Sequence, residues 1–406
     1  MNRNVRSIIV LVVVLALVNP LGAAEALSTQ APIDDLAFYE ASTATDTFPL
    51  GGGKVRNVIL CIGDGMGLNQ IALSSVRATG LDGRLCMERM PVTGLMRTHS
   101  ADSSVTDSAA AGTALAAGVK TKNGMIGMTP DGKNYCTILE AAKARGMATG
   151  LVVTSTISHA TPASFASHVR SRKMEEVIAE QLIANKVNVL LGGGRKFFLP
   201  KGDPNSGRSD DRDLIAEAEE AGYLYVTTAA ELGSAQCPYV LGLFQFEALT
   251  TMAPEPDLAT LTRRAIDLLG QTRRRGLFRR QPGFFLMVEG SQIDWACHEN
   301  DAARTVRQTL LFDQAVQAAI DFALRDRRTL VIVTADHETG GLTLSAGKTA
   351  DDPVVHWSTK GHSGSPVPIA ALGPGAAVFA GLQDNTDVPT KIAQLLGIKP
   401  FPRPAE

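Results

Sequence analysis

The stretch "VRNVILCIGDGMG", residues 55–67, joins an apolar run to an acidic side chain. The run from Val55 to Ile62 is mostly apolar and rich in branched residues, which is typical of a strand in a parallel sheet covered on both faces. Asp64 follows it between two glycines. Since the carboxyl ends of such strands form the ligand crevice of an open α/β sheet, Asp64 is a first candidate site residue.

Similar apolar runs alternate along the chain with longer amphipathic ones, the pattern of strands linked by helical crossovers. Further strands are predicted at Thr149–Thr154, Val187–Leu191, Phe284–Val288 and Leu330–Thr334, and helices at Met174–Ala184, Ala259–Leu269 and Arg304–Leu324. We therefore predict an α/β fold, a three-layer sandwich in which a large, mostly parallel central sheet has helices on both faces. Because no repeat and no second unit of comparable size is visible, residues 54–406 are expected to form a single domain.

Composition and charge narrow the class of partner. The chain has 406 residues, of which 45% are hydrophobic, and a formal net charge of −2. This near-neutrality argues against nucleic acid or a membrane surface as the partner, because either would require a matching net charge. A small ligand is expected.

The first residues predict an export signal. Arg3 and Arg6 precede an apolar run over residues 8–18, and Ala24-Glu25-Ala26 offers a small-x-small cleavage site, so residues 1–26 are interpreted as a signal peptide. An uncleaved membrane anchor is the alternative, although the run is shorter than the ~20 residues of a spanning helix. Residues 27–53 are expected to form an arm or linker. The mature protein is expected to be periplasmic or secreted, without stable membrane insertion.

Five cysteines follow, an odd number, so at least one thiol must stay unpaired within an exported monomer. Cys61 lies inside the first apolar strand and is expected to be a buried core thiol. The spacing of the others predicts no connectivity and no zinc or redox site of the CxxC type.

Chemistry-bearing residues follow four of the predicted strands. Asp64 follows the first strand and Glu289 the fourth; the second runs on to His159 and Thr161, and the fifth to Asp336 and His337. Taken singly, an acid after a strand is more often a helix cap than a catalytic group. Their convergence on one edge of the sheet favours a site.

The segment "VEGSQIDWACHEND", residues 288–301, strengthens this interpretation. Asp294 and His298 are four residues apart, so on a helix both would project from one face and could bind one ion. The alternative is an exposed pair on a solvated helix. His337 and His362 add two imidazoles, which suit zinc.

The segment "SVTDSAAAGTALAAG", residues 104–118, begins a small-residue helix with a hydroxyl. Ser108 follows an N-cap at Thr106 or Asp107, so it lies in the first helical turn, where free N–H groups and the helix dipole favour a phosphate. The alanines and glycines would let this helix lie close against the sheet. Taken alone, Ser108 could equally be a cap residue of a packed helix.

Together these segments resemble the alkaline phosphatase family. The resemblance runs from about Asn57 to Gly373 through "NVILCIGDGMG", "VTDSAAAGTALAAG", "SHATPASFASHVRSRK", "VEGSQIDWACHEND", "TADHETGG" and "KGHSG", in the family's order. It implies a metal-dependent hydrolase that cleaves small phosphate monoesters through a phosphoserine on Ser108 and releases inorganic phosphate. It also implies a homodimer.

The resemblance further implies two Zn²⁺ ions and one Mg²⁺ ion, with an arginine that grips the substrate phosphate. The implied sites are a first zinc on Asp294, His298 and His362, a second zinc on Asp64, Asp336, His337 and Ser108, a third metal on Asp64, Thr161 and Glu289, and the phosphate-binding Arg172.

This chain has His159 and Trp295 where the best-known enteric bacterial member has Asp and Lys, whereas other bacterial members resemble this chain at both places. Both side chains are expected near the third metal and the phosphate, and the third site is left open between magnesium and another divalent ion.

Two alternatives belong to other classes of function. A phosphodiesterase or sulfatase could use the same scaffold, although no CxPxR-like motif of sulfatases is present. A non-catalytic phosphate- or zinc-binding protein would not need both Ser108 and Arg172. The physiological substrate cannot be inferred from the sequence.

Overall fold

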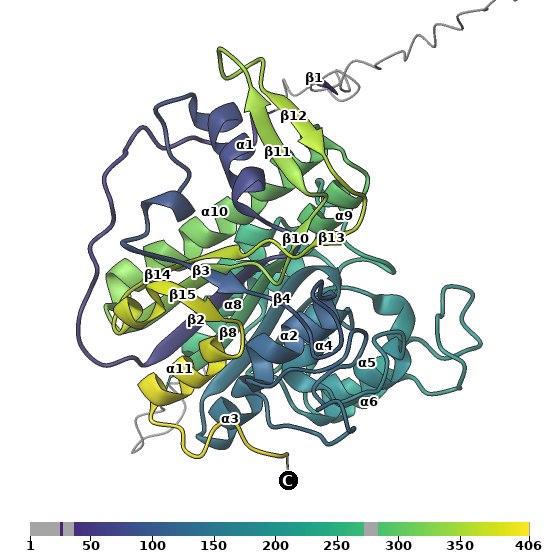
Figure 1. Ribbon diagram of the computed structural model, residues 1–406. Coiled ribbons are helices and arrows are strands. Elements are labelled where there is room, and N and C mark those ends of the chain that lie inside the picture. The colour runs from purple at the N-terminus through teal and green to yellow at the C-terminus, as the bar shows by residue number, and fades with distance from the viewer. Residues whose placement is uncertain (1–24, 27–35, 272–282, 406) are drawn as a thin grey trace, which may run out of the picture.

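The computed structural model describes residues 25–26, 36–271 and 283–405, and its centre is a ten-stranded sheet (Figure 1). The strands of this sheet are β2 (Asn57–Gly63), β3 (Val92–Arg97), β4 (Ala148–Thr156), β5 (Val189–Gly193), β6 (Leu224–Val226), β7 (Val240–Leu243), β8 (Phe284–Gly290), β9 (Thr329–Thr334), β14 (Val367–Leu372) and β15 (Gly381–Asp384). Their order is β15-β3-β14-β9-β2-β8-β4-β5-β7-β6. All neighbours are parallel except those of β14, which is antiparallel to both β3 and β9.

The register of the central strands aligns their carboxyl ends. Ile62 of β2 pairs with Glu289 of β8 on one side and with Thr334 of β9 on the other. Val153 of β4 also pairs with Glu289. The loops that leave β2, β4, β8 and β9 therefore begin at one edge of the sheet.

Helices cover both faces of the sheet (Figure 1). On one face α8 (Leu258–Gln271) and α10 (Ala302–Asp326) pack on the central strands, and α1 (Leu68–Thr79) packs on α10. On the other, α3 (Ile138–Ala144) and α4 (Ala160–Ala166) pack on β4 and β8. The remaining helices are α2 (Ser108–Ala117), α5 (Glu175–Ala184), α6 (Leu214–Glu220), α7 (Ala229–Ser234), α9 (Gln292–His298) and α11 (Asp387–Leu396), with short 3-10 turns η1 (Met87–Arg89), η2 (Arg195–Phe198) and η4 (Ala376–Phe379).

Two small antiparallel sheets lie outside the central one. One joins β1 (Glu25–Ala26), β12 (Val354–Trp357) and β11 (Leu342–Ala346). The other consists of two residues on each side, β10 (Glu338–Thr339) and β13 (His362–Ser363). Of this second pair, β10 closely follows β9 along the chain, and its pairing with β13 brings His362 to the edge where β9 ends.

The predicted three-layer α/β fold with a mostly parallel sheet is confirmed. The five predicted strands and three predicted helices form within two residues of their expected bounds. Every residue of β2 is buried, and Cys61 has no exposed surface, as expected. All five cysteines are free thiols.

The expectations about the N-terminus remain predictions. Residues 1–24 and 27–35, which hold most of the predicted signal peptide and the start of the predicted arm, lie outside the described residues. Among the residues that the structure describes, none forms a helix long and apolar enough to cross a membrane.

Candidate functional site

Four side chains at the carboxyl edge of the sheet have no exposed surface. They are Asp64 after β2, Glu289 in β8, and Asp336 and His337 after β9. No hydrogen bond reaches either carboxylate oxygen of Asp64 or Glu289, or Oδ2 of Asp336. His337 has the one imidazole among them, and its Nε2 lies 3.2 Å from Asp336 Oδ2 and 3.5 Å from Asp64 Oδ1. Burying three carboxylates with so few partners costs several kcal/mol or more, so this edge requires a cation or bound protons.

The pKa values of this cluster also indicate that its carboxylates need a cation or bound protons. Burial, followed by the nearby charges of Asp336 and Asp294, raises the pKa of Asp64 well above its usual value. Burial also raises the pKa of Glu289 to about 8. A divalent cation among these groups would reverse both shifts and keep the carboxylates ionised at neutral pH.

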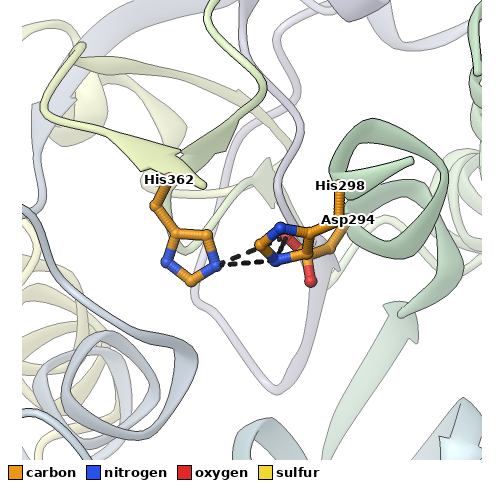
Figure 2. Close-up of side chains that lie close together, drawn as sticks. All are labelled: Asp294, His298 and His362. Carbon is orange, nitrogen blue, oxygen red and sulfur yellow. Dashed lines mark hydrogen bonds and ion pairs between the residues drawn. The ribbon is translucent and has the colours of Figure 1, made fainter. Parts of the chain in front are cut away.

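The first group of possible metal ligands consists of Asp294 and His298 on α9 and His362 on β13 (Figure 2). His298 Nε2 lies 3.3 Å from Asp294 Oδ1, and His362 Nε2 lies 3.6 Å from the same oxygen. The two Nε2 atoms are 3.2 Å apart. The four-residue spacing therefore places Asp294 and His298 on one face of a helix, as the sequence indicated.

The tautomers of both imidazoles suit a metal. His362 Nδ1 donates to the carbonyl of Thr106 at 2.8 Å, and His298 Nδ1 donates to the carbonyl of Lys360. A carbonyl oxygen can only accept, so in the neutral ring the proton is on Nδ1 and the lone pair is on Nε2. Both Nε2 atoms face Asp294 and each other, an arrangement that is repulsive unless a bound cation or a proton lies between them; without a metal, the bond to Asp294 raises the pKa of His298 to about 9.

A second group lies beside the first and shares Asp294 with it. Ligand atoms of Asp64, Asp294 and His337 lie within 4.8 Å of one another. His337 Nε2 lies 3.2 Å from Asp336 Oδ2, while Asp336 Oδ1 accepts from the backbone N–H of Gly65 and of His337. The ring of His337 stacks on that of His362, with centroids 3.6 Å apart, so the two groups are adjacent.

Asp64, His159 and Glu289 form a third group. Thr161 Oγ1, which follows His159 by two residues, is buried without a hydrogen-bond partner. The sequence analysis placed Thr161 in this site and gave His159 only a neighbouring role. The structure brings His159 into the group as well.

Ser108 and Arg172 are joined through Asp107, the residue before Ser108. Asp107, and not Thr106, is the N-cap of α2, because its Oδ1 accepts from Ala110 N at 3.0 Å. Ser108 thus begins the helix, and its Oγ lies 3.3 Å from His337 Nε2. Arg172 Nη1 donates to Asp107 Oδ2, and Nη2 donates to His159 Nε2, each over 3.1 Å.

Trp295 packs against His159. The two rings meet edge to face, with centroids 6.1 Å apart and an interplanar angle of 84°. Burial and the charge of Arg172 lower the pKa of His159 to about 3, so this ring is neutral. It can therefore accept from Arg172 while it packs against the indole.

One local expectation is corrected. The small residues of α2 do not serve close packing on the sheet, because the helix makes its main contacts with α4. A Cβ on Gly112 would lie 2.8 Å from Ser164 Oγ and 3.4 Å from Thr161 Cα. Glycine is therefore needed so that α2, which carries Ser108, can lie close to α4, which carries Thr161.

The sequence analysis considered Asp107 only as a helix cap, and it missed Thr339. Asp107 joins the start of α2 to Arg172, and Thr339 Oγ1 donates to Asp294 Oδ1 at 2.5 Å while it lies 3.2 Å from His337 Nδ1. Asp107 is next to Ser108, and Thr339 is two residues after His337, so closeness in sequence to a selected residue was the signal that could have identified their contacts.

Comparison with known proteins agrees with this geometry. The family model described as alkaline phosphatase matches residues 55–353 and 347–398. The chain is 37% identical to alkaline phosphatase 4 of Bacillus subtilis (84% of this chain, 89% of the relative), and 34% identical to alkaline phosphatase of Escherichia coli K12 (86% and 88%). Streptomycin-6-phosphate phosphatase of Streptomyces griseus is 36% identical (88% and 94%).

Among solved structures, the alkaline phosphatase of the Antarctic bacterium TAB5 superposes with a TM-score of 0.77 at 34% identity, covering 86% of this chain and all of the other. That of Thermus thermophilus superposes with a TM-score of 0.77 at 27% identity, covering 87% and 94%. With the same family found by sequence and by structure over most of its length, the chain belongs to the alkaline phosphatase family, and it is a metal-binding phosphomonoesterase.

Proposed function

We propose that this enzyme hydrolyses phosphate monoesters by way of a phosphoserine on Ser108. The observation that carries the proposal is the position of this hydroxyl: Ser108 begins α2, and its Oγ lies 3.3 Å from Nε2 of His337, which follows the buried carboxylate of Asp336. The first-turn N–H groups of the helix and the Arg172 guanidinium provide donors for the phosphoryl oxygens.

Three metal ions complete the proposed site. The first zinc would be held by Asp294, His298 and His362, the second by Asp64, Asp336, His337 and Ser108, and the third ion by Asp64, Thr161 and Glu289. The orphaned carboxylate oxygens and the Nε2 lone pairs of the two histidines fit such ions, because carboxylate and imidazole are ligands for zinc. When bound, the ions supply positive charge that lowers the pKa of a coordinated hydroxyl and offsets the charge developing in phosphoryl transfer.

The chain's own residues perform the transfer in two displacements. In the first, Ser108 Oγ gives its proton to water and forms a bond to phosphorus, while the bond from phosphorus to the substrate alcohol breaks and the alcohol oxygen takes up a proton from water. In the second, the oxygen of a water molecule bonds to phosphorus and loses a proton to solvent, the bond to Ser108 Oγ breaks, Ser108 Oγ takes up a proton, and inorganic phosphate leaves. Arg172, held by Asp107, keeps the phosphoryl group aligned in both steps.

The third site is proposed to take magnesium or another divalent ion. The presence of an imidazole in this group favours an ion that accepts nitrogen, whereas magnesium prefers oxygen ligands. A His-to-Asp variant of the TAB5 enzyme is described with Mg bound in its M3 site. We infer that His159 lets the third site bind an ion that accepts a nitrogen ligand as well as magnesium, and that an aspartate at position 159 would favour magnesium.

The setting of the enzyme is proposed from the sequence. Residues 1–26 would be removed as a signal peptide, residues 27–53 would form an arm, and residues 54–406 would act as one catalytic domain in the periplasm or medium. The enzyme would work as a homodimer on small phosphate monoesters.

Metal analysis and a substrate panel test the proposal together. The purified enzyme should contain two zinc ions and one further divalent ion per chain, and should hydrolyse p-nitrophenyl phosphate far faster than bis-p-nitrophenyl phosphate or p-nitrophenyl sulfate. A preference for the diester would favour a phosphodiesterase, and bound zinc without turnover of any ester would favour a non-catalytic binding protein.

A further inference from the structure

Glu338 is a buried carboxylate that the proposed mechanism does not use. It lies in β10 directly after His337 and is 5% exposed. Its two oxygens accept four hydrogen bonds: Oε1 from Gln70 Nε2 at 2.8 Å and Leu342 N at 3.2 Å, and Oε2 from Gly341 N at 3.2 Å and from Ser363 Oγ. Within the described residues it belongs to none of the three groups of possible metal ligands.

The pairing of β10 with β13 places the Glu338 carboxylate on the opposite face of the strand pair from His362. Glu338 is opposite Ser363, and Thr339 is opposite His362. Opposite residues of an antiparallel pair share a face, so Glu338 and Ser363 lie on one face while Thr339 and His362 lie on the other. On that second face Thr339 Oγ1 bonds Asp294 and His362 Nε2 approaches the same carboxylate (Figure 2 shows Asp294, His298 and His362).

This pair of strands is short enough to need a fixed register. Each strand has only two residues, and a slip by one residue would turn His362 to the opposite face. The bond from Ser363 Oγ to Glu338 Oε2 joins the two strands, side chain to side chain, in the observed register.

The same carboxylate also joins the loop that carries Asp64. Gln70 Nε2 donates to Glu338 Oε1 and to Thr339 O, both over 2.8 Å, while Gln70 Oε1 accepts from Gly67 N. A Cβ on Gly67 would lie 2.5 Å from Glu338 Cγ. Only glycine lets this loop pack so closely on Glu338.

We propose that Glu338 is a positioning residue for the first zinc site: through Ser363 it sets the register of β13, and thereby aims His362 Nε2 at Asp294 and His298. The proposal rests on the zinc ligands named under Proposed function. It predicts that loss of the Glu338 carboxylate weakens zinc binding without removing any ligand.

The test is the zinc affinity of the full-length Glu338→Gln enzyme, stripped of metal and titrated against a chromophoric chelator. The amide replaces one acceptor oxygen by an NH₂ group that faces donors, so the pair should lose its register. We expect the apparent Kd of one zinc equivalent to rise about 10- to 100-fold, as is typical when a partner of a metal ligand is removed. At saturating zinc most of kcat should return.

The matched control is Glu88→Gln. Like Glu338, Glu88 accepts hydrogen bonds from a serine hydroxyl and from the backbone: its Oε2 accepts from Ser75 Oγ at 2.5 Å and from Leu85 N at 2.8 Å. Unlike Glu338, it has no bond to β13. Its zinc Kd should equal that of the parent enzyme. His362→Ala, which removes a ligand, marks the effect of full loss of the site.

Circular dichroism shows whether Glu338→Gln folds. If it does not fold, Ser363→Ala is the variant that tests the proposal. Removing this hydroxyl should also raise the zinc Kd, by less than Glu338→Gln does, and a folded double variant should bind zinc no more weakly than Glu338→Gln alone. Parent-like zinc affinity in folded Glu338→Gln, or in Ser363→Ala where the first variant does not fold, would overturn the proposal. A parent enzyme that binds no zinc would instead contradict the ligand set itself.

Discussion

At the scale of single residues, Asp107 links Ser108, the proposed nucleophile, to Arg172, the arginine proposed to bind phosphate. Its Oδ1 caps α2 through Ala110 N, and its Oδ2 accepts from Gly124 N and from Arg172 Nη1. One side chain thus fixes both the start of the helix at Ser108 and the guanidinium beside it. Arg172 in turn contacts His159, whose ring meets Trp295.

Trp295→Lys tests whether position 295 acts on bound phosphate. A unit charge ~6 Å from the phosphate contributes on the order of 1 to 3 kcal/mol at an effective dielectric of about 20 to 40, of which a mobile lysine recovers part. We expect inorganic phosphate to inhibit this variant roughly three- to tenfold more strongly at pH 8, at about 1.4 kcal/mol per tenfold change. The inhibition constant for phosphate is the measurement.

Trp295→Gln serves as the control for loss of the indole alone. His159→Asp should be measured singly and combined with Trp295→Lys, because a change of the third ion could mask the new charge. If phosphate inhibition stays the same in Trp295→Lys and in the double variant, residue 295 does not act on the phosphate.

The sequence predicted most of the side chains that meet at the site, because each follows a strand or lies in a helix with interpretable spacing. Asp294 and His298 could be paired from their separation of four residues. The contact of Asp107 with Arg172 and the roles of Thr339 and Glu338 could not be predicted in this way, because they depend on segments far along the chain. The bond from Arg172 to Asp107, for example, spans 65 positions.

At the scale of elements, the five contiguous strands β9, β2, β8, β4 and β5 were predictable, and the strands on either side of them were not. The strands β2 and β8 are buried along their whole length and stand out as continuous apolar runs. In contrast, β3 has exposed positions, β6 has three residues, and β14 contains Pro368, which argues against an interior strand. Whether these three segments form strands is decided by the strands that pair with them in the folded sheet.

Gly112→Val tests the close approach of α2 to α4. A branched side chain at this place would collide with Ser164 and the backbone of Thr161, so we expect a loss of about 1–3 kcal/mol in the free energy of unfolding, as for overpacked cores. Activity should fall too, because the helix that carries Ser108 must move. Urea denaturation and kcat/KM with p-nitrophenyl phosphate measure the two effects.

The comparison for that experiment is Gly270→Ala in α8. A Cβ on Gly270 meets nothing within 4 Å, so this change should be neutral or stabilise by up to about 1 kcal/mol. A Gly112→Val enzyme as stable and active as Gly270→Ala would show that the packing of α2 on α4 does not position Ser108.

His168 and Glu140 join α3 to the segment that leads to Arg172. Their Nε2 and Oε1 atoms are 3.1 Å apart, and His168 Nδ1 lies 2.7 Å from the Gly127 carbonyl. Burial acts to lower the pKa of His168, but Glu140 and the carbonyl outweigh it and raise the pKa. Burial likewise acts to raise the pKa of Glu140, and His168 outweighs it and lowers the pKa.

This pair should make stability depend on pH. The raised pKa of His168 gives stability that is fully present below its unfolded value, near 6.5, and is lost as the pH rises through the folded value. We expect His168→Gln to cost about 1–2 kcal/mol at pH 6 and less at pH 9, in urea denaturation with excess metal at both values. An equal cost at the two pH values would show that the charge of His168 does not contribute.

At the scale of the whole molecule, the edge of the sheet gathers negative charge from strands that are distant in sequence. Asp64, Glu289, Asp294 and Asp336 come from three separate parts of the chain and are all at most 5% exposed. Without cations their repulsion must oppose folding, and with cations they bind β2, β8, β9 and α9 into one unit.

Chelation should therefore lower thermal stability as well as activity. A ligand at about 1,000 times its Kd stabilises the native state by about 4 kcal/mol, so each tightly bound ion that is removed should lower Tm by several degrees. Thermal melts with EDTA, and with EDTA already saturated by zinc as the control, measure this. An unchanged midpoint in EDTA would show that the carboxylates do not share bound metal.

The central claim, that Ser108 is the nucleophile, is tested most directly by trapping the phosphoenzyme. The enzyme is mixed with substrate, quenched in acid and digested, and the peptide that contains residues 104–118 is examined by mass spectrometry beside that of Ser108→Ala. The account predicts phosphate on Ser108 in the parent enzyme, none on the variant, retained metal in both, and most of the turnover lost in the variant. A variant that still labels, or that keeps near-parental turnover, would contradict it.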